Sequence, residues 1–196
     1  MVVGLTGGIG SGKTTVSKMF ASHENVVVYN ADIEAKKLMN SSTLIQQQLI
    51  AEFGDKAYLN HKLNRPFIAE IVFNNETKLK TLNSIVHPEV YKHLSSFIKN
   101  HNDKNYIIYE NAILFENKSD LFCNKIVTVT APVEIRINRV VKRDSVSKKA
   151  VKDRMQNQWK ENLKTLQSHY VIMNKKLDST RSQVSTIHNT LINSLH

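Results

Sequence analysis

The sequence is poor in cysteine and in long apolar runs. Its single cysteine, Cys123, cannot form a disulfide within the chain, which excludes a disulfide-stabilised scaffold and favours a reducing compartment. No window approaches the roughly 18 apolar residues that a membrane-spanning helix needs. Met1 leads directly into an apolar run and glycines, without the features of an export signal. We therefore expect a cytoplasmic protein that makes no membrane contact.

Glycine and proline are scarce as well, with 6 and 3 residues in a chain of 196. This scarcity excludes a Gly-rich linker between domains, and no internal repeat or low-complexity segment is visible. A chain of this length, with 41% hydrophobic residues, is long enough for one buried core and short for two independent domains. We expect a single domain over residues 1–196.

Basic residues outnumber acidic ones by 27 to 17, which gives a formal net charge of +10. An anionic partner is therefore expected, and nucleic acid is one candidate. However, the basic residues are spread along the whole chain and form no long consecutive run. A polyphosphate substrate explains the charge equally well, and so does a lysine-rich solvated surface. We expect small-molecule substrates and no nucleic-acid partner.

Short apolar runs alternate with amphipathic stretches along the chain. The runs have the length and β-branched content of buried strands, and they lie at residues 2–5, 26–29, 106–109, 126–129 and 170–173. Strands that alternate with helices predict an α/β fold, here a doubly wound, five-stranded parallel sheet with helices on both faces.

One long stretch, from about residue 41 to 101, has a helical pattern and no predicted strand. We interpret it as a helical insertion, in which Pro88 begins a new helix because its missing N–H is unneeded in a first helical turn. Basic helical stretches after the fourth strand predict a short lid. The expected parts are a core (about 1–40, 102–135 and 165–196), the insertion (about 41–101) and the lid (about 136–164).

Five of the six glycines fall in the first twelve residues, at the end of the first predicted strand. Residues 7–14, GGIGSGKT, fit the phosphate-loop pattern G-x-x-x-x-G-K-[ST] between a strand and a helix, which is the context that the motif requires. Backbone N–H groups of such a loop surround a phosphate, the lysine reaches the β- and γ-phosphates, and the hydroxyl ligates Mg²⁺. The predicted ATP-binding residues here are Gly8, Gly10, Ser11, Gly12, Lys13, Thr14 and Thr15.

A guanine-nucleotide switch is disfavoured, because no D-x-x-G follows the second strand and Leu177 stands where N-K-x-D needs aspartate. Small-molecule kinases place a carboxylate after the second strand and arginines in a lid. Asp32 fits the first feature and is either a general base or a helix N-cap.

The lid feature is matched by Arg136, Arg139 and Arg143, whose spacing predicts a stripe on one helix that either closes over ATP or forms a solvated basic face. Glu110, which ends the third strand, either holds Mg²⁺ through water or caps the following loop.

Taken together, these residues resemble the dephospho-coenzyme A kinase family over nearly the whole length of the chain. The matching blocks, in order, are the phosphate loop with Leu5 and Thr6, Asn30-Ala31-Asp32, Leu63-Asn64-Arg65, Val86-His87-Pro88, Leu114-Phe115-Glu116, Arg143-Asp144 with Arg154 and Gln158, and residues 171–174. The resemblance implies a P-loop kinase that transfers the γ-phosphate of ATP to the ribose 3′-hydroxyl of dephospho-coenzyme A, with Mg²⁺.

The resemblance also implies individual roles. Asp32 becomes the base and binds the acceptor, together with Arg65, His87 and Leu114. Arg139 and Arg143 act from the lid, Lys13 acts at the phosphates, and Asn174 lies near adenine. The chain departs from the family at Asn30, Asn64, Glu110 and Ala112, where the family usually has Asp, Asp, Asp and Pro.

Two other functions stay open from sequence alone. One is a kinase of the same architecture that acts on another hydroxyl, and the other is a nucleotide-switched regulator or a nucleic-acid-binding P-loop protein. We expect a monomer or a weak homo-oligomer.

Overall fold

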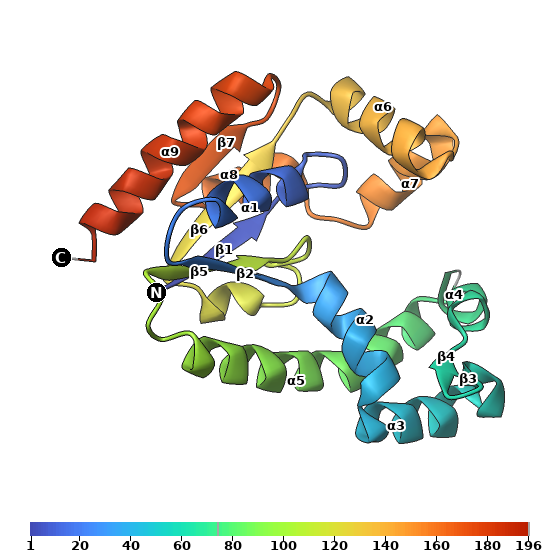
Figure 1. Ribbon diagram of the computed structural model, residues 1–196. Helices are drawn as coiled ribbons and strands as arrows, with labels where there is room; N and C mark the ends of the chain where they lie inside the picture. Colours follow the sequence, from blue (N-terminus) through green and yellow to red (C-terminus); the bar gives the residue numbers. More distant parts are fainter. Residues whose placement is uncertain (74, 196) are drawn as a thin grey trace. The chain divides into compact units, whose positions relative to one another are not determined.

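A computed structural model describes residues 1–73 and 75–195 of the protein (Figure 1). The chain divides into two compact units: the first comprises residues 1–29 and the described residues from 101 onward, and the second comprises Asn30–Asn100. The predicted insertion starts near residue 41, whereas the second unit already begins at Asn30.

The first unit contains a parallel sheet and its covering helices. Its elements are β1 (Val2–Thr6), α1 (Lys13–Ala21), β2 (Val26–Asn30, whose last residue falls in the second unit), β5 (Tyr106–Glu110), η2 (Ser119–Phe122), β6 (Lys125–Thr130), α6 (Val133–Asp144), α7 (Lys148–Gln156), α8 (Glu161–Leu166), β7 (Tyr170–Met173) and α9 (Leu177–Asn193). All five predicted strands are present, which confirms the predicted fold class.

The strand order in this sheet is β2-β5-β1-β6-β7. β1 pairs in parallel with β5 on one side and β6 on the other, and β6 pairs in parallel with β7. All five residues of β1 are buried, as expected for the central strand of a covered parallel sheet. Because the chain leaves β1 toward β2 on one side and later fills the other side with β6 and β7, the carboxyl end of β1 lies at a switch in strand order. Such a switch is where open α/β sheets bind ligands.

Helix α1 packs against β1, β5 and α9, and α9 also packs against β7 (Figure 1). The apolar residues that face each other across these contacts form one buried cluster. Its members are Val3, Leu5, Val16, Phe20, Val26, Tyr106, Ile108, Val127, Val129, Ile172, Val184, Ile187 and Leu191. This core fixes the end of β1 relative to the start of α1, and so positions the loop between them.

The second unit is mainly helical. It comprises α2 (Ala31–Ser41), α3 (Thr43–Phe53), η1 (Asp55–Ala57), β3 (Tyr58–Leu59), β4 (Lys62–Leu63), α4 (Arg65–Phe73) and α5 (Glu76–Asn100). The short antiparallel hairpin of β3 and β4 was not predicted. Its strands are two residues long, too short for the alternation that reveals a strand in a sequence.

The prediction that Pro88 begins a helix is wrong, because Pro88 lies inside α5. Proline removes one helical hydrogen bond and crowds the preceding turn. Helix α5 nevertheless continues, because it packs against α2, α3 and α4 and buries Val86, Val90 and Leu94 on both sides of the proline. Tertiary packing, rather than local preference, supplies most helix stability in proteins.

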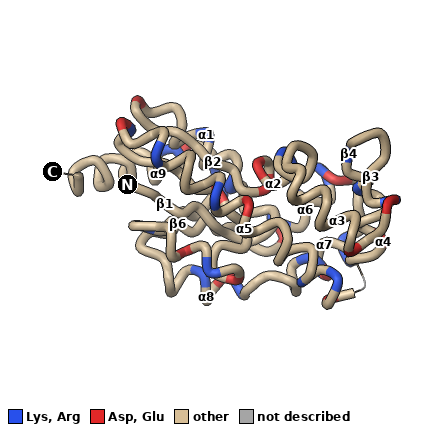
Figure 2. Tube along the Cα trace, turned by 90° about the horizontal axis from the view of Figure 1, so that it is seen from below, with Lys and Arg blue, Asp and Glu red and all other residues tan. Residues whose placement is uncertain are grey.

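Charged residues are dispersed along the chain. Figure 2 shows Lys and Arg alternating with Asp and Glu over the elements of both units, without a long segment of one sign. Within residues 1–73 and 75–195, no helix combines the length and the apolar character needed to cross a bilayer.

Candidate active site

The phosphate loop, residues 7–14, connects the end of β1 to the start of α1. Gly10 has a φ of 78° and Gly12 a φ of 93°, a backbone region that side chains other than glycine rarely adopt. A Cβ on Gly10 would collide with the carbonyl oxygen of Arg136, and one on Gly12 would collide with Nδ2 of Asn174. Two of the predicted glycines are therefore required by both backbone conformation and space.

Lys13 begins α1, so the first N–H groups and the partial positive charge of this helix point toward the loop. The Lys13 Nζ donates to the carbonyl oxygen of Gly7 at 2.8 Å and lies 3.5 Å from that of Gly8. The lysine thus reaches back over the loop. Ser11 Oγ is buried and has no hydrogen-bond partner among the described residues, so it is a further polar group that a bound anion can use.

Thr14 and Glu110 lie together, on α1 and at the end of β5. Thr14 Oγ1 donates to Glu110 Oε1 at 2.8 Å, and Ser17 Oγ donates to the other carboxylate oxygen at 2.8 Å. Glu110 is 6% exposed, so its charge is held close to the loop with little screening. Within the described part of the chain, no group of three or more His, Cys, Asp or Glu residues forms a complete metal site.

Asn174 follows β7 and is 2% exposed. Its Nδ2 donates to the carbonyl oxygen of Ser11 at 2.8 Å, and its Oδ1 accepts from Thr180 Oγ1 at 3.1 Å. The side chain therefore braces the phosphate loop. Arg139 joins the same cluster, because its Nη2 donates to the Asn174 carbonyl oxygen at 3.0 Å and its Nη1 to that of Ser11 at 3.4 Å.

The three arginines of α6 have different surroundings. Arg136 is buried, and its guanidinium donates to the carbonyl oxygen of Ile9 at 3.0 Å and pairs with Glu161 at 3.1 Å. Arg143 is mostly exposed and forms two hydrogen bonds with the neighbouring Asp144. Hydrogen bonding to Asp144 raises the pKa of Arg143, and Arg143 lowers the pKa of Asp144. The three arginines of the predicted stripe therefore differ: Arg136 is buried and supports the loop, Arg139 lies beside the loop, and Arg143 is exposed.

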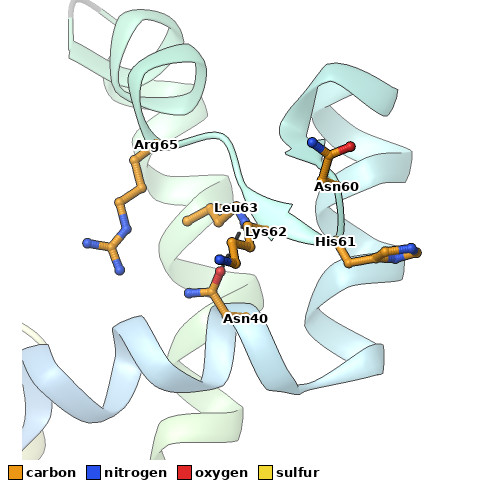
Figure 3. A pocket seen from close by; sticks show the side chains of 6 residues that line it. All are labelled: Asn40, Asn60, His61, Lys62, Leu63 and Arg65. Carbon is orange, nitrogen blue, oxygen red and sulfur yellow. Dashed lines mark hydrogen bonds between the residues drawn. The ribbon is translucent and has the colours of Figure 1, made fainter.

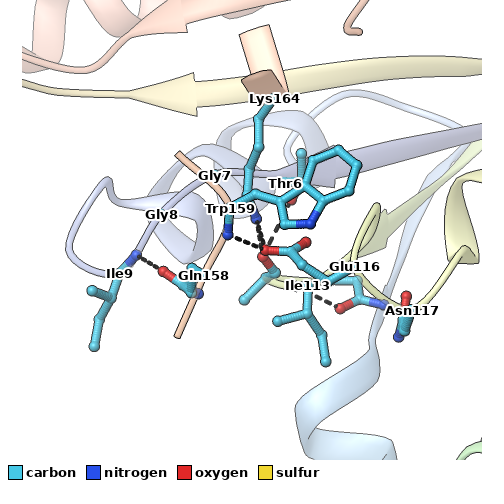
Figure 4. A network of polar contacts seen from close by, with 12 residues as sticks. Thr6, Gly7, Gly8, Ile9, Ile113, Glu116, Asn117, Gln158, Trp159 and Lys164 are labelled. Atoms are coloured by element: carbon cyan, nitrogen blue, oxygen red, sulfur yellow. Dashed lines mark hydrogen bonds and ion pairs between the residues drawn. The ribbon is translucent and has the colours of Figure 1, made fainter. Parts of the chain in front are cut away.

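A polar network on the other side of the phosphate loop was not predicted (Figure 4). Gln158 Oε1 accepts a hydrogen bond from the N–H of Ile9 at 2.8 Å. Glu116 Oε1 accepts from the N–H of Trp159 at 2.9 Å and from Lys164 Nζ at 2.7 Å. The Lys164 side chain is fully buried, and burial lowers its pKa while the bond to Glu116 opposes that shift.

The second unit holds the other predicted residues. Asp32 is exposed in the first turn of α2, and His87 is half-buried on α5, where burial lowers its pKa. Arg65 is exposed at the start of α4 and lines a pocket of about 570 Å³ beside the β3–β4 hairpin (Figure 3). The other residues that line this pocket are Asn40, Asn60, His61, Lys62 and Leu63.

Leu114 lies in the first unit and has no exposed surface. A Cβ on Gly4 would approach its Cδ2 to 2.8 Å, so the side chain packs beneath β1. The structure gives Leu114 a packing role, and its acceptor-binding role stays a prediction.

Comparison with known proteins decides among the kinase families that share such a loop. A family model described as dephospho-CoA kinase matches residues 1–179. The chain belongs to the dephospho-CoA kinase family. The dephospho-CoA kinase of Fusobacterium nucleatum is 38% identical over 163 residues, which cover 81% of this chain and 83% of the relative. That of Chlorobaculum tepidum is 35% identical over 200 residues, which cover 98% and 95%.

Solved structures support the same fold. A crystal structure from Thermus thermophilus matches with a TM-score of 0.85 at 27% identity, covering 97% of this chain and 96% of that one. The shikimate kinase of Acinetobacter baumannii matches with a TM-score of 0.58 at 16% identity, covering 100% and 95%. At that identity the likeness concerns the fold alone.

Two departures from the dephospho-CoA kinase pattern have local structural roles. Asn30 Oδ1 accepts from the N–H of Ile33 at 2.9 Å and so caps α2. Asn64 Oδ1 accepts from the N–H of Phe67 at 3.4 Å, and its Nδ2 donates to the Lys56 carbonyl oxygen at 2.9 Å. Aspartate at either position retains the cap, because a carboxylate also accepts this bond. Only Asn64 uses its amide as a donor as well.

Proposed function

We propose that this protein is a dephospho-CoA kinase, which transfers the γ-phosphate of ATP to the ribose 3′-hydroxyl of dephospho-coenzyme A and releases ADP. This reaction is the final step of coenzyme A biosynthesis. The observation that carries the proposal is the phosphate loop at the end of β1, in a chain whose residues 1–179 match the dephospho-CoA kinase family.

ATP binding is assigned to the loop and its supports. Gly8, Gly10, Ser11 and Gly12 supply backbone N–H groups, while Thr14 and Thr15 continue them into the first turn of α1. Lys13, which contacts loop carbonyls at 2.8 and 3.5 Å, turns to the β- and γ-phosphates when they bind. Asn174 holds the loop at Ser11, and a further contact with adenine is part of the proposal.

Mg²⁺ is the proposed cofactor, and the donors at the loop fit it. Thr14 offers a hydroxyl and Glu110 a buried carboxylate, 2.8 Å apart. Mg²⁺ prefers oxygen ligands and typically uses one or two protein groups, with phosphate oxygens and water completing its shell. When bound, the ion neutralises charge on the phosphates. Thr14 would hold it directly, and Glu110 through water.

The acceptor is assigned to Asp32, Arg65, His87 and Leu114. Asp32 takes the proton of the attacking hydroxyl, a contribution of about 10²- to 10⁴-fold in general-base catalysis. Arg65 supplies a positive charge beside a pocket that Lys62 also lines, which suits the anionic diphosphate of dephospho-coenzyme A. Arg139 and Arg143 neutralise the transferring phosphoryl group from the lid.

The remaining assignments concern the setting of the enzyme. A cytoplasmic location, a monomer or weak homo-oligomer, and the absence of a nucleic-acid partner stay predictions. The lone Cys123 supports the location, and the dispersed basic residues support the absence of a nucleic-acid partner.

The proposal is tested by measuring ADP release with ATP and Mg²⁺ across dephospho-coenzyme A, adenosine monophosphate, adenosine, shikimate and gluconate. We expect turnover of dephospho-coenzyme A alone. Lys13→Ala and Asp32→Asn should each lower kcat about a hundredfold or more, whereas Asp55→Asn, an exposed control, should not. Turnover of a different acceptor in place of dephospho-coenzyme A would refute the proposed substrate. ATP binding without turnover of any acceptor would favour a regulatory protein.

A further inference from the structure

The tip of the phosphate loop is held by two residues of the lid, Arg136 and Gln158. The N–H of Ile9 donates to Gln158 Oε1 at 2.8 Å, and the carbonyl oxygen of Ile9 accepts from Arg136 Nε at 3.0 Å. Arg136 belongs to α6, whereas Gln158 lies between α7 and α8. The half-buried side chain of Gln158, at the far end of the lid, therefore fixes the direction of the Ile9 N–H.

This contact also controls a second group through the peptide bond between Gly8 and Ile9. The described chain contains no cis peptide bond, so the Gly8 carbonyl and the Ile9 N–H lie in one plane and point in opposite directions. The Gly8 carbonyl oxygen accepts from the N–H of Ser11 at 3.1 Å and lies 3.5 Å from Lys13 Nζ. Rotation of this plane would move the carbonyl that guides Lys13. Gln158 is thus connected to the phosphate-binding Lys13 through a single rigid group, the Gly8–Ile9 peptide.

Gln158 itself is positioned by an anchor on the neighbouring residue (Figure 4). The N–H of Trp159 donates to Glu116 Oε1 at 2.9 Å, and the Trp159 ring stacks on Phe115 with centroids 5.9 Å apart. Glu116 is in turn fixed by Lys164 Nζ at 2.7 Å, which also donates to the Ala112 carbonyl oxygen at 2.8 Å.

The Lys164 side chain is 0% exposed and that of Glu116 16%, so the pair is largely shielded from water. A buried ion pair generally adds little stability over an apolar pair of similar size, but its geometry is restrictive. A restrictive geometry helps to keep one side chain in place in a segment that lies between two helices, α7 and α8.

We propose that Gln158 is a positioning residue for ATP, and that the buried Lys164–Glu116 pair acts through it. Gln158 holds the Gly8–Ile9 peptide in the orientation that aligns the phosphate loop and Lys13. This inference rests on the proposed function, because it requires that the loop binds ATP. It assigns no contact between Gln158 and the acceptor.

The test compares Gln158→Met, Gln158→Ala and the control Gln156→Ala, which changes an exposed glutamine at the end of α7. Calorimetry with a non-hydrolysable ATP analogue gives Kd, steady-state kinetics give KM for each substrate, and thermal melting reports on folding. Methionine keeps the length of the side chain but removes the acceptor. We expect both Gln158 variants to weaken ATP binding by about three- to tenfold, the effect of one lost hydrogen bond. KM for dephospho-coenzyme A and the melting temperature should stay close to those of Gln156→Ala.

Three results would overturn the role of Gln158: unchanged ATP affinity, wild-type affinity in Gln158→Met, or equal increases in KM for both substrates. A wild-type protein that fails to bind ATP would instead refute the proposed function, so the two failures are distinguishable.

The buried pair is tested with the double variant Lys164→Met and Glu116→Leu, which leaves no buried charge unpaired. We expect a folded protein whose ATP affinity falls by the same factor as in Gln158→Met. Adding Gln158→Met to this variant should cause no further loss, because both changes release the same peptide. Losses that multiply would show that the pair acts independently of Gln158, and would overturn that part of the inference.

Discussion

At the scale of single residues, Glu110 carries a buried negative charge between two hydroxyl groups. Glu110→Gln keeps an acceptor for Thr14 and a polar contact for Ser17 but removes the charge. We expect kcat to fall by about tenfold or more, because a neutral side chain holds Mg²⁺ less well and the phosphate charge is then less well neutralised. The apparent Mg²⁺ requirement should rise. A magnesium titration of activity measures both effects, and Glu24→Gln, an exposed position, is the control. An unchanged titration curve would contradict the metal role.

Gly12, like Gly10, has a positive φ and no room for a Cβ atom. Gly12→Ala places a methyl group against Asn174 Nδ2 and strains a φ of 93°. Gly54→Ala is a matched control, since Gly54 has a φ of 85° but an added Cβ would meet nothing within 4 Å. We expect ATP affinity to fall at least about tenfold in Gly12→Ala only, because the contact that braces the loop at Ser11 is displaced. Equal ATP affinity in the two variants would argue against this brace.

Sequence patterns identify functional residues when the residues that act together are neighbours in the sequence. Lys13 and Thr14 are recognisable because the loop and its strand-to-helix setting are contiguous in the chain. Lys164 is not recognisable, because its burial depends on Glu116, a residue far away in sequence. Gln158 belongs to a block that resembles the family, yet its contact with Ile9 follows only from the fold.

At the scale of elements, a histidine just after α1, His23, contacts a histidine of α9, His188. The imidazole rings of His23 and His188 stack with centroids 3.8 Å apart, and Tyr106 hydrogen-bonds to His188 Nδ1 at 2.6 Å. Burial, with a smaller contribution from His23, lowers the pKa of His188. The unfolded chain therefore binds a proton more tightly than the folded one. The contribution of neutral His188 to the free energy of unfolding is therefore fully present above the ordinary histidine pKa of about 6.5. It is lost as the pH falls below that value.

We expect the melting temperature to drop by about 2 °C more in the wild type than in His188→Asn when the pH falls from about 7.5 to 5. Asparagine can keep a contact with Tyr106 but does not titrate in this range. The effect is small because the histidine pair is partly solvated. Parallel melting curves for the two proteins would show that His188 does not couple α9 to pH.

Elements were predictable where the sequence has a clear apolar run or a clear helical period. The five strands of the sheet satisfy this condition, whereas α5 contains Pro88 and hides its continuity. The hairpin of β3 and β4 is too short to have a pattern. In both cases packing inside the second unit decides the outcome, and packing partners are invisible in a single sequence.

At the scale of the whole molecule, the candidate residues are distributed over two compact units. The residues proposed for ATP lie in the first unit, and Asp32, Arg65 and His87 lie in the second. The sequence predicted an insertion from about residue 41. The second unit instead begins at Asn30, because α2 packs against α3 and α5.

Because the proposed ATP residues and most of the proposed acceptor residues lie in different units, we expect substitutions in the second unit to change the affinity for the acceptor and not that for ATP. Arg65→Ala should raise KM for dephospho-coenzyme A by about tenfold or more, through loss of a charge-assisted contact, and leave the Kd for ATP unchanged. Lys80→Ala removes an exposed lysine of the same unit and is the control. Steady-state kinetics with each substrate varied in turn measure the effect. A change in ATP affinity with unaltered KM for the acceptor would contradict the assignment of Arg65.

The central claim, that the γ-phosphate of ATP is transferred to the ribose 3′-hydroxyl of dephospho-coenzyme A, is tested most directly by phosphorus NMR of the reaction mixture. We expect one new phosphomonoester on the ribose 3′-oxygen for each ADP formed, and neither product with Lys13→Ala. Formation of ADP with inorganic phosphate alone, or of a phosphate ester at another position, would contradict it.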